Sequence, residues 1–281
     1  MPTIADRRSM FRALHESGCF LLPNPWDVGS ARYLQHLGFK ALATTSAGFA
    51  FSQGRPDNAV PRGMMLDHIR AIVEATDVPV NADFEGGYAH SPEGVAESVR
   101  MCVATGVSGL SIEDSNGEGE EPLYAIDHAV ARIRAARAAI DEMGDAREVV
   151  LTGRSEGFLV GRPDLDATIR RLKAYAEAGA DCVYAPGVRS REAIAAIVQA
   201  VAPKPVNVLM GAPSDLTVAD LTALGARRVS VGGGLARAAW GGFTRTARAL
   251  AETGRFDAFA DAAPHGELNQ FFLDDLAKRQ R

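Results

Sequence analysis

The sequence has few cysteines and no long apolar segment. Its three cysteines, Cys19, Cys102 and Cys182, are far apart and lack the spacing of a metal site, so we expect free thiols in a reducing compartment. The stretch from Met1 to Arg8 is polar and has no signal-peptide core, and no run approaches the ~18 uninterrupted apolar residues of a membrane helix. We therefore expect a cytoplasmic protein that does not interact with membranes.

Positive charge is also not in excess. The formal net charge is −5, whereas a nucleic-acid-binding protein usually carries a basic stripe. We therefore expect no nucleic-acid partner. The six histidines show no metal-ligand spacing, so we interpret them as surface or structural residues.

Length and hydrophobic pattern indicate an α/β fold. With 281 residues and 47% hydrophobic side chains, the chain has the size of one α/β barrel of about 250 residues. Short apolar runs alternate with longer amphipathic segments along the chain. The apolar runs predict strands over Phe20–Leu22, Ala41–Thr44, Val78–Asn81, Gly109–Glu113, Val149–Arg154, Cys182–Ala185, Val206–Leu209 and Arg228–Val231. The other segments predict helices over Val28–Leu37, Gly63–Ala75, Pro92–Thr105, Ala125–Met143, Asp164–Ala178, Arg191–Ala200, Val218–Leu224 and Leu235–Glu252.

Eight strand–helix units in series predict a closed (β/α)8 TIM barrel. A doubly wound open sheet would alternate in the same way, but polar clusters follow so many of the strands that we prefer the barrel. We treat residues 1–281 as a single barrel domain with a C-terminal extension over residues 255–281. Its Leu268–Leu276 stretch is amphipathic, so it packs either on a neighbouring subunit or on its own barrel.

Polar clusters stand where the third, fourth and fifth predicted strands end. Asn81, Asp83 and Glu85 follow the third strand, and Glu113 ends the fourth. All strand C-termini of a parallel barrel open onto one face, so these side chains should converge there. Asn81, Asp83 and Glu85 alternate and would point to the same side of a strand, although a solvated turn would give the same pattern. Convergent carboxylates suit a hard cation, so these four residues are candidate metal ligands.

Arg154 ends the fifth strand and is a candidate anion-binding residue. A guanidinium at a barrel mouth suits a carboxylate or phosphonate, and a salt bridge to Glu85 or Glu113 is the alternative, compatible with the first role. The small residues from Thr44 to Gly48 could form a backbone anion nest or an ordinary turn. The Gly-rich, acidic loop from Ser115 to Pro122 could act as a lid or have no role.

In this order the clusters resemble the isocitrate lyase/phosphoenolpyruvate mutase superfamily. The resemblance extends over nearly the whole chain. It rests on Pro23-Asn24-Pro25-Trp26-Asp27, Thr44-Thr45-Ser46-Ala47-Gly48, Asn81-Ala82-Asp83, Ile112-Glu113-Asp114, Gly153-Arg154-Ser155-Glu156 and Ala178-Gly179-Ala180-Asp181.

The resemblance implies a (β/α)8 barrel whose last helix is exchanged between subunits, giving a homodimer or homotetramer. It also implies that a small 2-oxo acid or its enolate binds on Mg²⁺, with Mn²⁺ as the alternative ion. By this resemblance Asp83 is the main metal carboxylate, Asn81 stands where many members have a second aspartate, and Glu113 is another acid of the metal shell.

Further roles follow from the same resemblance. Arg154 corresponds to the arginine that binds substrate and enolate oxygen. The remaining assignments are Thr45, Ser46 and Ala47 as backbone donors to the substrate carboxylate, Asp57 as an aspartate near the reacting centre, and Asn207 as a substrate contact. We therefore expect Arg154, Asp57 and Glu113 to be catalytic.

The chain departs from the superfamily pattern in the loop after the fourth strand. The lyases have a Lys-x-Cys-Gly-His type motif there, and the mutases a lysine and an asparagine, where this chain has Gly119 and Glu121. The hypothesis is a Mg²⁺-dependent enzyme that cleaves a C–C bond of a 2-oxo acid through an enolate, as a lyase or decarboxylase. The alternatives are a phosphonopyruvate mutase or hydrolase, and a binding protein without turnover.

Overall fold

The computed structural model describes residues 2–117 and 119–280. Met1, Glu118 of the expected lid loop and Arg281 of the expected extension lie outside the described residues. The chain divides into two compact units, one ending at Leu235 and one beginning at Ala236. The two are described separately below.

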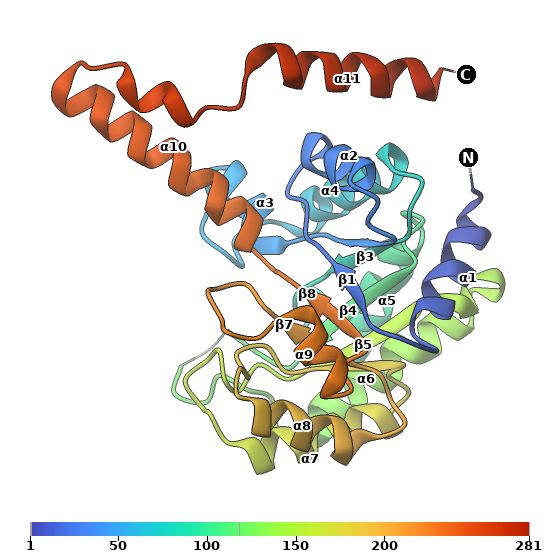
Figure 1. The fold of residues 1–281 in the computed structure, drawn as a ribbon. Helices are drawn as coiled ribbons and strands as arrows, with labels where there is room; N and C mark the ends of the chain where they lie inside the picture. The colour runs from blue at the N-terminus through green and yellow to red at the C-terminus, as the bar shows by residue number, and fades with distance from the viewer. Residues whose placement is uncertain (1, 118, 281) are drawn as a thin grey trace. The chain divides into compact units, whose positions relative to one another are not determined.

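The first unit is a barrel of eight parallel strands (Figure 1). Their order around the sheet is β1-β8-β7-β6-β5-β4-β3-β2, so each strand from β2 onward pairs with the next along the chain and β8 pairs with β1. This confirms the predicted (β/α)8 TIM barrel. The strands are β1 Phe20–Leu22, β2 Leu42–Ala43, β3 Val80–Asp83, β4 Gly109–Glu113, β5 Val150–Arg154, β6 Cys182–Tyr184, β7 Val206–Leu209 and β8 Arg228–Ser230.

A side chain links the strands at the seam between β1 and β2. Besides one backbone bond, from Ala43 N to the Pro23 carbonyl at 3.0 Å, the Asn24 carboxamide spans this region. Its Nδ2 donates to the Thr44 carbonyl at 2.8 Å, and its Oδ1 accepts from the amides of Val231 and Gly232 at 3.0 and 2.8 Å. Asn24 thus connects the ends of β1, β2 and β8, where the mouth of the barrel begins.

Seven helices of the first unit match predicted ones to within about two residues at each end. They are α2 Val28–His36, α4 Arg62–Ala75, α5 Pro92–Val103, α6 Ile126–Asp141, α7 Leu165–Glu177, α8 Arg191–Val201 and α9 Val218–Ala223. Their apolar faces pack against the outward-facing strand residues, such as Leu110 and Ile112 of β4, in one large core. The helices therefore hold the strands so that their carboxyl ends form one face.

Three further elements were not predicted from the sequence: α1 Ile4–Leu14, α3 Ser46–Ser52 and the 3-10 helix η1 Gly144–Glu148. Helix α1 begins at a capping box, in which Thr3 Oγ1 accepts from the Asp6 amide and the Asp6 carboxylate accepts from Thr3 N. Its buried side chains are polar as well as apolar: Arg7 donates to the carbonyls of Val73 and Thr76. This mixed face lacks the apolar periodicity that reveals a helix in a sequence.

The second unit has almost no interior. It contains the part of α10 (Gly234–Thr253) from Ala236 onward, the 3-10 helix η2 (Asp257–Asp261) and α11 (His265–Arg279). Apart from Ala236, none of their described residues is buried. Large apolar side chains are exposed instead, namely Trp240, Phe243, Leu250, Phe256, Phe259, Leu268, Phe272, Leu273 and Leu276. Helices of this kind need a packing partner to be stable.

The three cysteines are free, and Cys102 and Cys182 are buried. Among the described residues, no helix combines the length and apolar character that crossing a membrane requires.

Candidate active site

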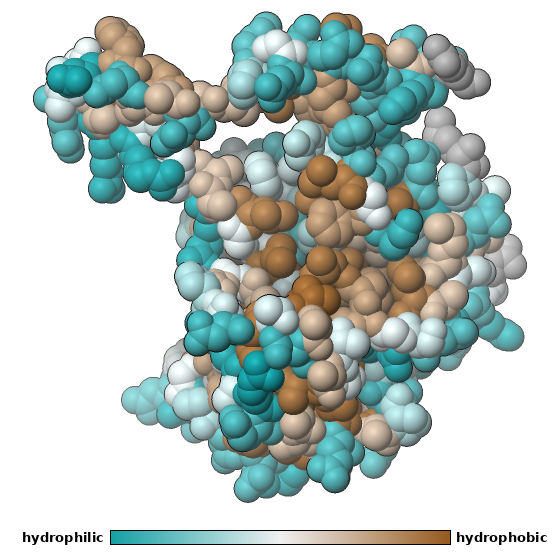
Figure 2. Space-filling view, in the orientation of Figure 1, coloured by the Kyte–Doolittle hydropathy of each residue, from teal (hydrophilic) through white to brown (hydrophobic). Residues whose placement is uncertain are grey.

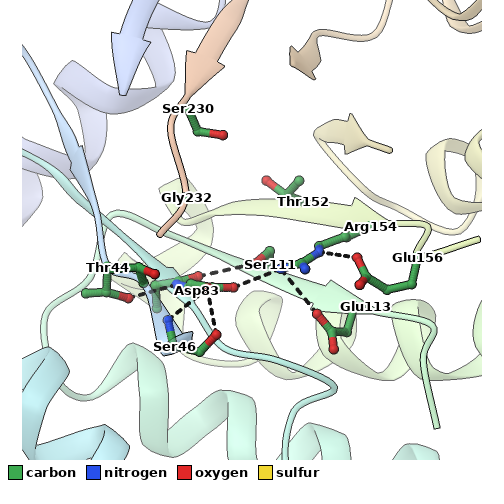
Figure 3. Close-up of polar contacts among 12 residues, drawn as sticks. Thr44, Ser46, Asp83, Ser111, Glu113, Thr152, Arg154, Glu156, Ser230 and Gly232 are labelled. Atoms are coloured by element: carbon green, nitrogen blue, oxygen red, sulfur yellow. Dashed lines mark hydrogen bonds and ion pairs between the residues drawn. The ribbon is translucent and has the colours of Figure 1, made fainter. Parts of the chain in front are cut away.

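Arg154 gathers three carboxylates at the mouth of the barrel. It ends β5 directly beside Glu113, which ends β4. Its Nη1 lies 3.0 Å from Asp83 Oδ1 and 3.2 Å from Glu113 Oε2, and its Nε donates to Glu156 Oε1 at 2.5 Å. Figure 3 shows these side chains turned toward one guanidinium from β3, β4, β5 and the segment after β5. The predicted convergence of acids at this face is therefore present for Asp83 and Glu113.

The cluster is largely buried and has three acids around one guanidinium. The side chain of Arg154 is 15% exposed and that of Glu113 is 9% exposed. Burial raises the pKa of Glu113, and the neighbouring Glu156 raises it further, while Arg154 opposes both. Burial disfavours the charge on Arg154, but Glu113, Glu156 and Asp83 outweigh it and raise the pKa of Arg154. Arg154 is thus a permanent cation that three acids share.

Asp83 is held from the opposite side by the segment after β2. Thr45 caps the short helix α3, with its Oγ1 accepting from Gly48 N at 3.2 Å. This geometry points both Ser46 N and Ser46 Oγ at Asp83 Oδ2, each at 2.9 Å. The amides of Ser46 and Gly48 are therefore occupied, and Ala47 N–H, in the first turn of α3, has no intrahelical acceptor.

Glu85 and Asp57 complete the acidic surroundings of Asp83. Burial, followed by the charge of Asp83, raises the pKa of Glu85 to about 7. The same two causes, in the same order, raise the pKa of Asp57. Glu85 and Tyr88 adopt positive φ angles of 48° and 55°, a strained conformation for side-chain-bearing residues that occurs most often at functional sites.

Two of the predicted site residues lie deeper in the barrel. Asn81 stands two residues before Asp83 on β3, and its Oδ1 lies against Gly109 at the start of β4, next to the ring of Phe11. Asn207 on β7 is 2% exposed and bonds to Arg228 and Ser230. Neither asparagine hydrogen-bonds to the Arg154 cluster, and their roles toward metal and substrate stay predictions.

Oxygen donors suited to a divalent cation lie around Asp83, but they are not in a ready-made metal-binding arrangement. Among residues 2–117 and 119–280, no three acid, histidine or cysteine side chains stand in a ready-made metal geometry, because Arg154 binds the carboxylates instead. The chemistry of the donors nevertheless fits Mg²⁺, which takes oxygen ligands. Buried Glu85 Oε1 and Asn81 Oδ1 also lack a hydrogen-bond donor within the described structure. Asp83, Glu85 and Glu113 are therefore the side chains that could hold such an ion.

Two further acids of the site, Asp114 and Glu156, belong to the motifs noted in the sequence but were given no role there. Glu156 bonds to Arg154, and its own amide donates to Asp114 Oδ1 at 2.8 Å. Asp114 is buried, and its Oδ2 accepts from Tyr175 Oη at 2.5 Å and from Arg171 at 3.1 Å. Glu156 stands two residues after Arg154, and this spacing was the available signal for a second site acid. Nothing in the sequence identified the Tyr175–Arg171 support of Asp114.

The loop after β4 folds back on itself. Ser115 and Leu123 form an antiparallel bridge, and Asn116 N donates to the Pro122 carbonyl at 2.9 Å. The guanidinium of Arg162 donates to the carbonyl of Glu120 and so ties this loop to the segment after β5. Its action as a lid stays a prediction.

Comparison with known proteins identifies the family. Residues 11–251 match the family model described as phosphoenolpyruvate phosphomutase. A Burkholderia cenocepacia J2315 protein described as a candidate lyase/mutase is 48% identical over 96% of both chains, and its crystal structure agrees with a TM-score of 0.91. The oxaloacetate decarboxylase of Paraburkholderia xenovorans (strain LB400) is 32% identical over 233 residues, which are 80% of this chain and 74% of that protein.

A third relative contains a ligand and a metal. The crystal structure of a phosphonopyruvate hydrolase complex with oxalate and Mg²⁺ shares 25% identity, covers 97% of both chains and has a TM-score of 0.84. The chain therefore belongs to the phosphoenolpyruvate phosphomutase family, part of the PEP mutase/isocitrate lyase superfamily of enzymes. The resemblance noted in the sequence is confirmed.

Proposed function

We propose that this protein is a cytoplasmic, Mg²⁺-dependent carbon–carbon lyase of the decarboxylase type. Its substrate would be a small 2-oxo diacid such as oxaloacetate, cleaved through an enolate. The observation that carries this proposal is the single buried Arg154 shared by Asp83, Glu113 and Glu156, because a fixed cation in a dry site stabilises a developing oxyanion. The names of the decarboxylase and hydrolase relatives support a small oxo acid as substrate.

In this mechanism Arg154 and the first turn of α3 bind the substrate. The Ala47 amide donates to the substrate carboxylate, and Ser46 and Thr45 hold the turn in place by their bonds to Asp83 and Gly48. Asp83, Glu85 and Glu113 would hold a Mg²⁺ ion, or Mn²⁺ in its place, and the bound ion would act as a Lewis acid. Arg154 donates to the enolate oxygen as the bond breaks, and Asp57 stands near the reacting centre.

Decarboxylation suits the residues of the loop after β4. Loss of CO₂ from the carboxylate β to the carbonyl of oxaloacetate leaves an enolate directly, and the enolate then takes a proton from water. Bond cleavage therefore requires an oxyanion-binding group and no base. Retro-aldol cleavage of a hydroxy acid needs a group to remove the hydroxyl proton. The described part of the loop contains no cysteine, lysine or histidine. The altered loop therefore favours decarboxylation over the cleavage of isocitrate-like substrates.

Turnover of 2-oxo acids tests the proposal. We expect Mg²⁺-dependent release of CO₂ from oxaloacetate above the rate with Mg²⁺ alone. Arg154→Ala should lower kcat about 100-fold or more, since it removes the oxyanion donor. Arg191→Ala is the control, because this exposed arginine at the start of α8 pairs with Asp220. Turnover by Arg154→Ala at the wild-type rate would contradict the proposal.

The same assay separates the two alternatives. Turnover of phosphonopyruvate, followed by phosphorus NMR, with none of oxaloacetate would favour the mutase or hydrolase. Oxalate binding without turnover of any 2-oxo acid would favour a binding protein.

A further inference from the structure

A second buried arginine crosses the interior of the barrel. Arg228, on β8, is 2% exposed. Its Nε donates to Asn207 Oδ1 at 3.0 Å, and its Nη2 donates to Thr152 Oγ1 of β5 at 2.9 Å. Its Nη1 lies 3.3 Å from His15 Nε2, just after α1. All three nitrogens of the guanidinium therefore have partners.

All of these partners are neutral. Within the described part of the chain, Arg228 makes no ion pair with a carboxylate, whereas buried charges are usually paired. Burial, and after it the charge of Arg228, lowers the pKa of His15 to about 3. His15 Nδ1 lies 2.7 Å from the Phe11 carbonyl, so Nδ1 carries the proton and Nε2 is free to accept from Arg228. Neutral side chains thus hydrogen-bond to the Arg228 guanidinium, and no carboxylate among the described residues balances its positive charge.

A chain of side chains leads from Arg228 to the mouth. Asn207 Nδ2 donates to Ser230 Oγ at 2.9 Å. On β6, Tyr184 stands in register with Asn207 of β7 and with Arg154 of β5, and its ring centre lies 5.4 Å from Arg154 Cζ. Figure 3 shows Ser230 and Thr152 pointing into the space between β8 and β5, on the side where Arg154 lies. The guanidinium of Arg154 is therefore braced from the barrel interior.

At the mouth of the barrel, carboxylates outnumber cations. Asp83, Glu113 and Glu156 share one cation, Arg154, and a dianionic ligand adds further negative charge. Charges in a dry interior interact over longer distances than charges in water, because screening is weak. A fixed cation inside the barrel lowers the free energy of an anion at the mouth without touching it.

The geometry points to Arg228 as a positioning residue for anion binding: it braces Arg154 through Asn207, Ser230 and Tyr184, and its charge favours dianionic ligands. This inference rests on the proposed function, since it concerns the same mouth. Because Asn207, Thr152 and His15 hold the Arg228 guanidinium inside the barrel, we expect its effect on the affinity for the anion and on KM more than on the bond-breaking step.

Calorimetric titration of two ligands tests this role. Arg228→Met keeps most of the side-chain length without the charge, and Arg228→Lys keeps the charge. We expect Arg228→Met to bind oxalate in the presence of Mg²⁺ about 10-fold more weakly than wild type, and to bind Mg²⁺ alone more tightly, because a cation has been removed. Arg228→Lys should stay within about 3-fold of wild type for both ligands.

The control is another buried arginine. Arg7→Met removes a guanidinium that donates only to the carbonyls of Val73 and Thr76, so it should lower stability and change neither affinity. If Arg228→Met fails to fold, Ser230→Ala is the second variant. It removes the hydrogen bond between Ser230 and Asn207 and keeps the charge of Arg228, so it should weaken oxalate binding and leave Mg²⁺ binding unchanged.

The outcomes separate this inference from the proposed function. Unchanged oxalate and Mg²⁺ constants in a folded Arg228→Met, or an unchanged oxalate constant in Ser230→Ala, would overturn the positioning role alone. Equal weakening of both ligands in Arg228→Met would indicate general distortion and overturn it too. A wild-type protein that binds neither ligand would overturn the proposed function and, with it, this inference.

Discussion

At the scale of residues, Arg154 and a bound divalent cation would compete for the same carboxylates, Asp83 and Glu113. Arg154 bonds to Asp83, Glu113 and Glu156, while Ser46 satisfies the other oxygen of Asp83. A divalent ion bound by these acids would have to share Asp83 and Glu113 with Arg154. Burial first, and neighbouring carboxylates after it, raise the pKa values of Glu113 and Glu156, while Arg154 opposes the rise. Ligand, metal and proton should therefore bind in a coupled way.

The pH dependence of stability provides a test at a single residue. Burial, and after it the charge of Arg228, lowers the pKa of His15 from its ordinary value of 6.5 to about 3, so the unfolded chain binds more protons than the folded protein between these limits. This contribution to stability is present above pH 6.5 and is lost as the pH falls toward 3. The raised pKa values of Glu85 and Glu113 act in the opposite direction, which makes a difference measurement necessary.

We expect the stability advantage of wild type over His15→Gln to shrink by about 3 kcal/mol between pH 7 and pH 4, since one pKa unit corresponds to about 1.4 kcal/mol. Urea unfolding of both proteins at several pH values measures this difference. A constant difference across the range would show that His15 titrates normally in the folded state.

At the scale of elements, the repeating hydrophobic pattern predicted the order of strands and helices, whereas elements and contacts that depend on polar side chains were missed. Strand and helix order followed from hydrophobic period, and the acids Asp83 and Glu113 were placed correctly because strand C-termini share one face. The start of helix α3 was interpreted as a backbone anion nest or an ordinary turn, and the helix itself was missed because its start depends on the Thr45 cap. Residues brought together from distant strands, such as Arg228 and Thr152, have no sequence signal, because their contact depends on barrel closure.

At the scale of the whole molecule, the exposed apolar side chains of the C-terminal helices need a packing partner. Phe243 is 61% exposed, Phe256 70% and Leu273 53%, in a unit without a core of its own. Figure 2 shows hydrophobic residues also gathered on the first unit around β1 and β8, where Leu21 of β1 is partly exposed. The helix after β8 runs into the second unit, so the first unit contains few residues to cover this part. We propose a homodimer or homotetramer in which copies exchange these C-terminal helices.

Light scattering after size-exclusion chromatography measures the assembly. Wild type should have the mass of a dimer or tetramer, and Phe272→Asp combined with Leu273→Asp should shift it toward monomer, since charge would be buried in the interface. Leu159→Asp is the control, because this exposed leucine lies on the loop after β5. A monomeric wild type would contradict the exchange.

The central claim is that Arg154 and the acids around it form a metal-assisted site for a 2-oxo acid or its enolate. The most direct test is calorimetric titration of the wild-type protein with oxalate, which mimics the enolate, with and without Mg²⁺. We expect oxalate to bind in the micromolar range only when Mg²⁺ is present, and Asp83→Ala to abolish this binding. Absence of binding in both conditions would show that Arg154 and these acids do not form such a site.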